Sequence, residues 1–223
     1  MQLRILFLLT LLVLSGQCKQ SHKNVNAPAE TMGSASTTFV GYLSQNDQGA
    51  VLRACSDGKQ YRLSDATGRL DSLYRLACEP APIPGETVYA VLAGTLSADG
   101  STLSVERIDT LTAKSPANAC IPWEFWCSGV EPFWGLQISK AEGSLFFKDV
   151  GEQIGQAFAW VPPKTDGKSM WTYETAGLKV VIKKTPCSDG MSDLTYSYSV
   201  QLSIGDRTLN GCAIRWGESM PAE

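Results

Sequence analysis

Histidine is almost absent from this chain of 223 residues, and the only one is His22. Because His22 lies in a polar stretch close to the N-terminus, we expect no histidine in the folded part. Histidine is the usual general base of Ser-His-Asp and Cys-His catalysis and a common zinc ligand. The sequence therefore disfavours these forms of catalysis, and zinc held by histidine, in the folded part.

An excess of positive charge is also absent. The chain has 19 Lys and Arg residues against 22 Asp and Glu residues, and its formal net charge is −3. Nucleic-acid binding requires concentrated Lys and Arg to neutralise phosphates, so we expect no nucleic-acid partner. The 43% hydrophobic and 18% charged residues are typical of globular proteins, and the length allows one large domain or two small ones.

No hydrophobic run is long enough to cross a membrane as a helix, which takes about 20 apolar residues. The longest run, Ile5–Leu14, follows Arg4 and is typical of the apolar core of a secretory signal peptide. We therefore predict a signal peptide over residues 1–17.

The residues that end this signal indicate a lipid anchor. Leu14-Ser15-Gly16-Gln17-Cys18 resembles a bacterial lipobox, although glutamine stands directly before the cysteine where Gly or Ala is usual. The resemblance implies that Cys18 is lipidated and becomes the mature N-terminus. Ala27-Pro28-Ala29 leaves ordinary signal-peptidase cleavage open as the alternative.

The residue after the lipobox indicates which membrane the lipid is inserted into. Lys19 stands there instead of Asp, which resembles the sorting pattern of enterobacterial outer-membrane lipoproteins. We therefore expect a protein held by its lipid at the outer membrane of a bacterial cell envelope and facing the periplasm. Residues 18–37 are polar and without periodicity, so we predict a lipidated N-terminus and flexible tether there.

A Cys-x-x-Cys motif is missing too, so neither a thioredoxin-type redox pair nor a zinc ribbon is indicated, and we expect no metal or other cofactor. Apart from Cys18 the chain has an even set of cysteines: Cys55, Cys78, Cys120, Cys127, Cys187 and Cys212. An even set in an exported protein is typical of a disulfide framework. Six cysteines allow fifteen pairings. Grouping by sequence suggests Cys55 with Cys78, Cys120 with Cys127, and Cys187 with Cys212.

Strand patterns and one helical pattern follow one another between residues 38 and 115. The expected strands cover residues 39–43, 50–55, 59–63, 87–97 and 102–111. Between the third and fourth strands, Leu70, Leu73, Tyr74 and Ala77 recur with the spacing of a helix face. Three strands, a helix and two strands is the order of an OB-type barrel. We therefore predict a five-stranded OB-like barrel domain over residues 38–115.

Two segments of this domain carry a family resemblance. They are Arg53-Ala54-Cys55-Ser56-Asp57-Gly58-Lys59-Gln60-Tyr61 and Val88-Tyr89-Ala90-Val91-Leu92-Ala93-Gly94. With the order of elements, they resemble the OB-type domain of NlpE-like envelope lipoproteins. The Cys-x-x-Cys of the other domain of that family is missing here, so the resemblance does not imply copper handling.

Short strands with regular turns fill residues 119–217, after a linker over residues 112–119. The expected strands cover residues 133–139, 144–148, 156–161, 170–174, 178–184, 195–204 and 207–216. Many short strands of this kind favour an antiparallel sheet that curls or closes. The whole chain is therefore predicted to be mainly β, with a barrel followed by a second antiparallel β domain.

The second domain carries its own resemblance, in the segments Gly129–Trp134, Pro186–Asp193 and Leu209–Ala213. These segments resemble an uncharacterised family of bacterial envelope lipoproteins with EPFW and CxDGMS motifs, and the domain is similar in shape to META/HslJ-like domains and periplasmic lysozyme inhibitors. No catalytic activity is established for the family, so the resemblance implies a protein that is not an enzyme.

Carboxylates in these segments are the candidate functional groups, namely Glu131, Asp189 and Asp193. Two carboxylates brought together can act as general acid and base, as in glycoside hydrolysis. The simpler interpretation, which we favour, is that Asp189 and Ser192 bond the backbone of their own tight turn and that Glu131 bonds a strand-end amide.

An aromatic cluster gives a second set of candidates: Trp123, Phe125, Trp126, Phe133 and Trp134. Such a cluster can form a carbohydrate-stacking platform, a protein-binding patch or simply core. We expect Phe133 and Trp134 in the core and Trp123 and Trp126 between the two domains. Trp134 also joins Glu131, Asp189, Ser192 and Asp193 as a possible binding residue.

The sequence thus predicts a non-enzymatic envelope lipoprotein with a binding or sensing role, attached to the membrane through its lipid and able to meet an envelope protein partner. One alternative is an inhibitor of an envelope hydrolase such as lysozyme, with Pro186–Leu194 as the inhibitory loop. A second alternative is a carboxylate-dependent glycan hydrolase that uses Glu131 and Asp189.

Overall fold

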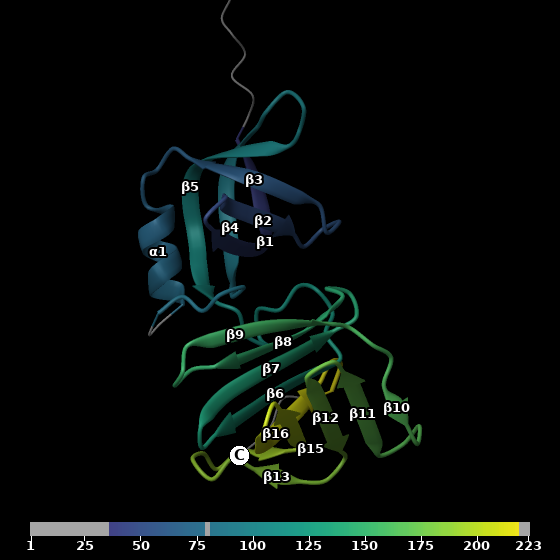
Figure 1. Ribbon diagram of the computed structural model, residues 1–223. Coiled ribbons are helices and arrows are strands. Elements are labelled where there is room, and N and C mark those ends of the chain that lie inside the picture. Colours follow the sequence, from purple (N-terminus) through teal and green to yellow (C-terminus); the bar gives the residue numbers. More distant parts are fainter. Residues whose placement is uncertain (1–35, 79–80, 219–223) are drawn as a thin grey trace, which may run out of the picture. The chain divides into compact units, whose positions relative to one another are not determined.

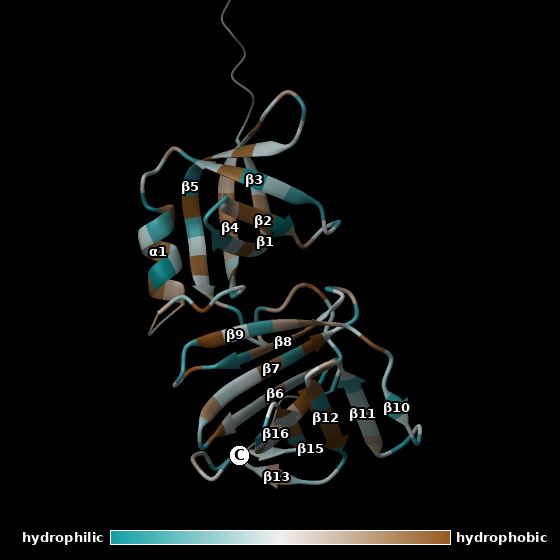
Figure 2. Ribbon diagram, viewed as in Figure 1, coloured by the Kyte–Doolittle hydropathy of each residue, from teal (hydrophilic) through white to brown (hydrophobic). Residues whose placement is uncertain are grey.

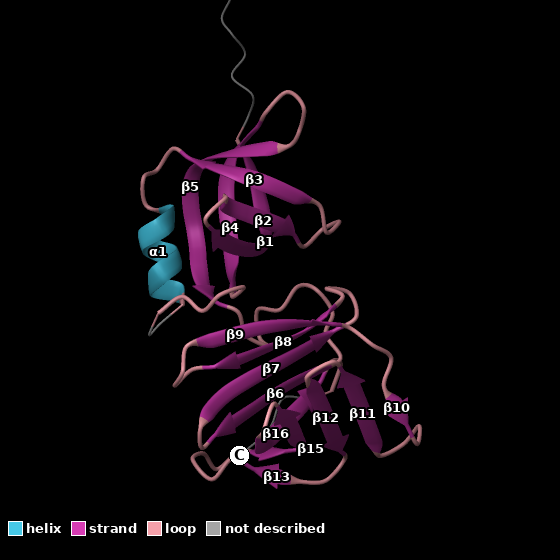
Figure 3. Cartoon of the chain, in the orientation of Figure 1, coloured by secondary structure: helices cyan, strands magenta, loops and turns pink. Residues whose placement is uncertain are grey.

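The computed structural model describes residues 36–78 and 81–218. The predicted signal peptide, Cys18 and most of the predicted tether lie outside these residues. Figure 3 shows that the described residues form strands, connecting loops and a single short helix. The mainly β fold predicted from the sequence is therefore confirmed.

The first group of strands forms a closed barrel. Its elements are β1 (Thr37–Asn46), β2 (Gly49–Ala54), β3 (Gln60–Asp65), α1 (Leu70–Ala77), β4 (Thr87–Leu96) and β5 (Thr102–Ala113). The strands are hydrogen-bonded in the order β1-β2-β3-β5-β4, and β4 pairs with β1 to close the ring (Figure 1). Only β3 and β5 run parallel. This order confirms the predicted OB-like barrel.

Alternating side chains fill the barrel. The fully buried ones include Leu43, Leu52, Leu92, Leu103 and Val105, and Figure 2 shows the matching alternation of hydrophobic and hydrophilic residues along the strands. The helix α1 packs its apolar side against this core through Leu70 and Tyr74. Asp65 accepts the backbone N–H of Leu70 at 2.9 Å, which satisfies a free amide at the start of the helix.

The second group of strands forms one antiparallel sheet. Its elements are β6 (Phe125–Val130), β7 (Phe133–Ser139), β8 (Ser144–Asp149), β9 (Ile154–Ala159), β10 (Lys164–Thr165), β11 (Met170–Thr175), β12 (Leu178–Lys183), β15 (Tyr198–Ile204) and β16 (Arg207–Arg215). The strand order is β10-β11-β12-β15-β16-β6-β7-β8-β9 (Figure 1). The first and last long strands in sequence, β6 and β16, therefore pair near the middle of the sheet.

This sheet curls around a core on one of its faces. In β12, Leu178, Val180 and Ile182 are buried in that core, whereas Lys179 and Lys183 on the other face are exposed. The other face is called the outer face below. A separate small hairpin, formed by β13 (Cys187–Ser188) and β14 (Thr195–Tyr196), lies outside the main sheet order.

The disulfide pairing differs from the sequence-based expectation. Cys187 and Cys212 form the predicted bridge, but Cys55 pairs with Cys120. Cys78 and Cys127 are free and buried, so the proposed Cys55–Cys78 and Cys120–Cys127 bridges, and with them the third disulfide, are wrong. Cys78 packs in the barrel core and Cys127 in the core of the second sheet, where neither meets another cysteine. Burial raises the pKa of the Cys78 thiol to about 11. Burial also raises the pKa of the Cys127 thiol.

Two ion pairs, one of them buried, join residues of the two groups of strands, in addition to the Cys55–Cys120 bridge. Lys114 follows β5 and contacts Glu142, between β7 and β8, at 2.8 Å, and the two side chains are only 8% and 14% exposed. Lys148 on β8 contacts Glu86 at 2.8 Å. Removing one partner of the buried Lys114–Glu142 pair leaves an unpaired buried charge, so this pair ties the barrel to the sheet.

Candidate binding groove

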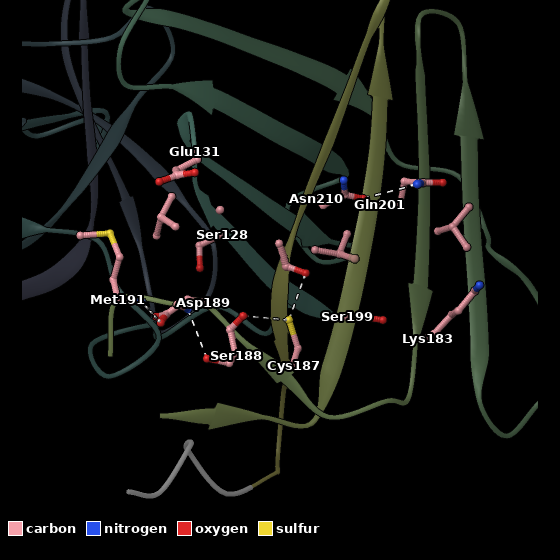
Figure 4. A pocket seen from close by; sticks show the side chains of 16 residues that line it. Ser128, Glu131, Lys183, Cys187, Ser188, Asp189, Met191, Ser199, Gln201 and Asn210 are labelled. Atoms are coloured by element: carbon pink, nitrogen blue, oxygen red, sulfur yellow. Dashed lines mark hydrogen bonds between the residues drawn. The ribbon is translucent and has the colours of Figure 1, made fainter. Parts of the chain in front are cut away.

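The outer face of the second sheet carries a groove of about 580 Å³. Its floor is formed by outward-pointing polar residues of four neighbouring strands: Ser128, Lys183, Ser199, Gln201 and Asn210. Figure 4 shows these side chains on adjacent strands, with the side-chain amide of Gln201 bonded to Asn210. We call this feature the outer groove.

One wall of the outer groove is the small hairpin, residues 187–196, which we call the pinned hairpin. Its first residue, Cys187, is bonded covalently to Cys212 on β16. Its two short strands pair Cys187 with Tyr196 and Ser188 with Thr195. The hairpin is therefore fixed at its base to β16, one of the strands that form the groove floor.

A network around Asp189 organises the turn of the pinned hairpin. The Asp189 carboxylate accepts the backbone N–H groups of Met191 and Ser192 at 3.0 and 2.9 Å, and it also accepts the Ser192 hydroxyl. The Tyr196 hydroxyl donates to it at 3.3 Å. The backbone bonds from Ser192 and Met191 lower the pKa of Asp189. Asp189 and Ser192 thus hold their own turn together, as the simpler sequence interpretation predicted.

Met191 lies at the tip of this turn, with 67% of its surface exposed. Glycine precedes it at position 190, where φ is 73°, a backbone conformation that side chains other than that of glycine rarely adopt. The turn therefore holds a large apolar side chain out into solvent while its backbone is fixed by Asp189. Met191 itself borders the outer groove.

The other predicted binding residues are scattered. Glu131 borders the same groove as Asp189, is exposed, and makes no hydrogen bond or ion pair with any residue that the structure describes, so the predicted bond to a strand-end amide is not formed. Asp193 is exposed but does not line the groove. Trp134 is 3% exposed and packs on the core face, so it cannot touch a ligand in the groove.

Two glycines explain the position of Trp134. A Cβ at Gly129 would lie 2.1 Å from its Nε1, and a Cβ at Gly211 would lie 2.9 Å from its Cζ2. The indole therefore lies against the backbone of β6 and β16, on the opposite side from the groove. The core prediction for Trp134 is confirmed, but the one for Phe133 is wrong, because Phe133 is 52% exposed at the start of β7.

The outer groove carries charged side chains of both signs. Glu131 and Asp189 both border the groove, as a pair of catalytic carboxylates would. The positively charged Lys183 also lines it, from strand β12 (Figure 4). A catalytic general acid needs a pKa raised toward neutrality, whereas the pKa of Asp189 is lowered, so Asp189 does not suit the role of the acid in such a pair. Asp189 is therefore a carboxylate at neutral pH, already engaged with its own turn. Among the described residues, no group of three or more His, Cys, Asp or Glu side chains is placed to hold a metal ion.

Sequence reasoning missed the groove floor. The residues Ser199 and Gln201 alternate with Tyr198, Val200 and Leu202, which are buried in the core. This alternation signals a strand with one polar face, but it does not reveal that the polar face borders a groove. That depends on the pairing of β15 with β12 and β16 and on the position of the pinned hairpin.

Comparisons with known proteins leave the groove without a precedent. No protein-family model, no curated protein and no solved structure matches this chain. In the described residues, no helix is long and apolar enough to cross a membrane.

Proposed function

We propose that this chain is an exported, non-enzymatic lipoprotein of the bacterial cell envelope that binds a protein partner through the pinned hairpin and the outer groove. One observation carries the proposal. Met191 is an exposed apolar side chain on a turn that a disulfide and the Asp189 network hold in place. A loop fixed before binding loses little conformational entropy when it binds, which favours affinity.

Export and anchoring form the first part of the proposal. Disulfides persist in oxidising compartments such as the periplasm, and the chain has Cys55–Cys120 and Cys187–Cys212. This supports export to an oxidising compartment, whereas the lipid on Cys18 and the position at the outer membrane rest on the lipobox-like segment and on Lys19. The OB-like barrel is compatible with kinship to NlpE-like lipoproteins, but a shared fold does not transfer a function.

The intact mass of protein taken from the cell envelope tests this part. We expect a chain that begins at Cys18 with acyl groups and gains two hydrogens for each of the two disulfides on reduction. A mass that begins near Glu30 without acyl groups would contradict the anchor and leave a diffusible protein.

The binding part of the proposal is tested by photocrosslinking in cells. A benzophenone amino acid replaces Met191, and in a matched control it replaces Met170, which is 41% exposed on β11 outside the groove. We expect a discrete protein adduct from position 191 and none from position 170. The same adduct from both positions, or none from position 191, would contradict binding by the pinned hairpin.

A second candidate function is inhibition of an envelope hydrolase such as lysozyme. The observation that favours it is the exposed and constrained turn of the predicted loop Pro186–Leu194, because rigid protruding loops fit enzyme clefts with little change of shape. Purified protein would protect cell-wall substrate from lysozyme, Met191→Ala would weaken the protection, and Met170→Ala would not. No protection at high molar excess would eliminate this candidate.

A further inference from the structure

The outer groove runs across the strands of the second sheet. The register of the sheet places Lys183 opposite Ser199, Ser199 opposite Cys212 and Cys212 opposite Ser128. These four residues therefore form one row on the outer face, from β12 to β6. Neighbouring strands lie about 4.8 Å apart, so the three steps of this row span about 14 Å.

The two ends of the groove carry opposite charges. Lys183 lines the groove from β12, and Glu131, which directly follows β6, borders its other end. Both side chains are exposed, and neither forms an ion pair or a side-chain hydrogen bond with any residue that the structure describes. A complementary surface must therefore be positive where it meets Glu131 and negative where it meets Lys183.

Apolar side chains also lie at both ends. Met191 projects from the pinned hairpin at the end that carries Glu131, whereas Lys183 lies at the opposite end (Figure 4). Val181 lines the groove two residues before Lys183, and it is half-buried on the outer face of β12. A surface that fits the groove therefore has an apolar spot to receive Met191 and an apolar side chain to cover Val181.

The polar side chains between the two ends can complement copies of themselves. The hydroxyls of Ser128 and Ser199 have no hydrogen-bond partner among the described residues, and Gln201 bonds Asn210 only at 3.4 Å. Hydroxyl and carboxamide groups both donate and accept hydrogen bonds. Two such floors that face each other can therefore satisfy one another's polar groups.

A second copy of the same face meets all three requirements. A half-turn about an axis that lies in the contact plane and crosses the middle of the groove exchanges its two ends. Glu131 of one copy then faces Lys183 of the other, and Met191 faces the end that carries Val181. Most soluble oligomers are homo-oligomers, and two-fold dimers are the commonest.

We infer that the protein partner of the outer groove is a second copy of this chain, bound in a symmetric dimer through two Glu131–Lys183 contacts. This inference rests on the proposed function, because it names the partner of the same hairpin and groove.

Charge reversal tests this dimer by sedimentation equilibrium of the purified full-length protein in a density-matched detergent. We expect a dissociation constant below about 100 μM. Glu131→Lys and Lys183→Glu should each weaken the dimer by at least about ten-fold, because each places like charges together at two symmetric contacts. The double variant with both substitutions restores opposite charges and should dimerise within about three-fold of the unmodified protein.

The matched control is Asp47→Lys. Asp47 is an exposed residue between β1 and β2 of the barrel, and its substitution changes the net charge as much as Glu131→Lys does. It should leave the dissociation constant unchanged. The inference is overturned if the unmodified protein shows no dimer at about 100 μM, if the single charge reversals have no effect, or if the double variant does not recover.

The crosslink from position 191 separates this inference from the proposed function. An adduct with the mass of two copies of the chain supports both. An adduct with a different protein alone would overturn the dimer and leave the proposed function standing. The absence of any adduct would overturn both.

Discussion

The barrel and the second sheet each bury one apolar face of their strands, but they do so in different ways. In the barrel, β4 pairs with β1, so every strand has two neighbours and the interior is filled by Leu and Val side chains. The second sheet stays open and ends at β9 and at the short strand β10. The outer groove is lined entirely by residues of the second sheet and its loops. An open sheet leaves its outer face and its edge strands free for binding. In a closed barrel the strand edges are paired with one another, and this pairing contributes to stability.

Removal of either disulfide tests this difference between the barrel and the second sheet, and it gives the largest expected loss of stability. The double substitution of Cys55 and Cys120 by Ala opens a loop with a sequence separation of 65 residues and should lower the free energy of unfolding by about 4 kcal/mol. The corresponding substitution of Cys187 and Cys212, with a separation of 25 residues, should cost about 3.5 kcal/mol.

Denaturant unfolding measures both losses, and crosslinking separates their consequences. The first double variant should keep the adduct from position 191 at temperatures where it is folded, because the pinned hairpin is intact. The second should lose the adduct while it is still folded. If the adduct were lost in the Cys55 and Cys120 variant but kept in the Cys187 and Cys212 variant, the claim that the Cys187–Cys212 bridge holds the binding hairpin in place would be contradicted.

A glycine pair tests how tightly the groove floor packs on the core. Gly129→Ala places a Cβ 2.1 Å from Trp134 Nε1, so it should lower the free energy of unfolding by about 1–3 kcal/mol through overpacking. Gly135→Ala is the matched control on the adjacent strand, where the nearest atom is Lys148 Cγ at 3.5 Å. It should change the stability by less than about 1 kcal/mol. Equal effects of the two substitutions would contradict the packing described for Trp134.

The smallest expected effect is a local dependence on pH in the pinned hairpin. The backbone N–H groups of Ser192 and Met191 lower the pKa of Asp189 in the folded chain. The ionised Asp189 carboxylate therefore stabilises the turn in full at pH values above its unfolded pKa of about 3.9. This stabilisation is lost as the pH falls through the lower pKa that Asp189 has in the folded chain. The amide NMR signals of Met191 and Ser192 should stay constant near neutrality and shift only in acid. Asp189→Asn should abolish this acid shift, and a shift near pH 7 would contradict the account.

The sequence anticipated the barrel well because its signals are local. The helical spacing of Leu70 and Tyr74 and the turn between β4 and β5 each depend on a few neighbouring residues. In the second sheet, β6 was not predicted, since Cys127-Ser128-Gly129 looks like a loop in isolation. Its strand form comes from pairing with β7 and with the distant β16.

The candidate site was predictable only in part, for the same reason. The bonding of Asp189 and Ser192 within their turn is local and was anticipated. The floor residues Gln201 and Asn210 become neighbours only through the pairing of β15 with β16. The Cys55–Cys120 bridge likewise depends on a long-range approach, so grouping the cysteines by sequence gave the wrong partners.

The most direct test of the central claim, that the open sheet and not the barrel meets the protein partner, compares crosslinking from one exposed residue in each. Met191 on the pinned hairpin is 67% exposed and Leu76 on α1 of the barrel is 61% exposed, so the two positions are equally accessible. With the same benzophenone amino acid at each position in cells, we expect a discrete protein adduct from position 191 and none from position 76. An adduct from position 76 without one from position 191 would contradict it.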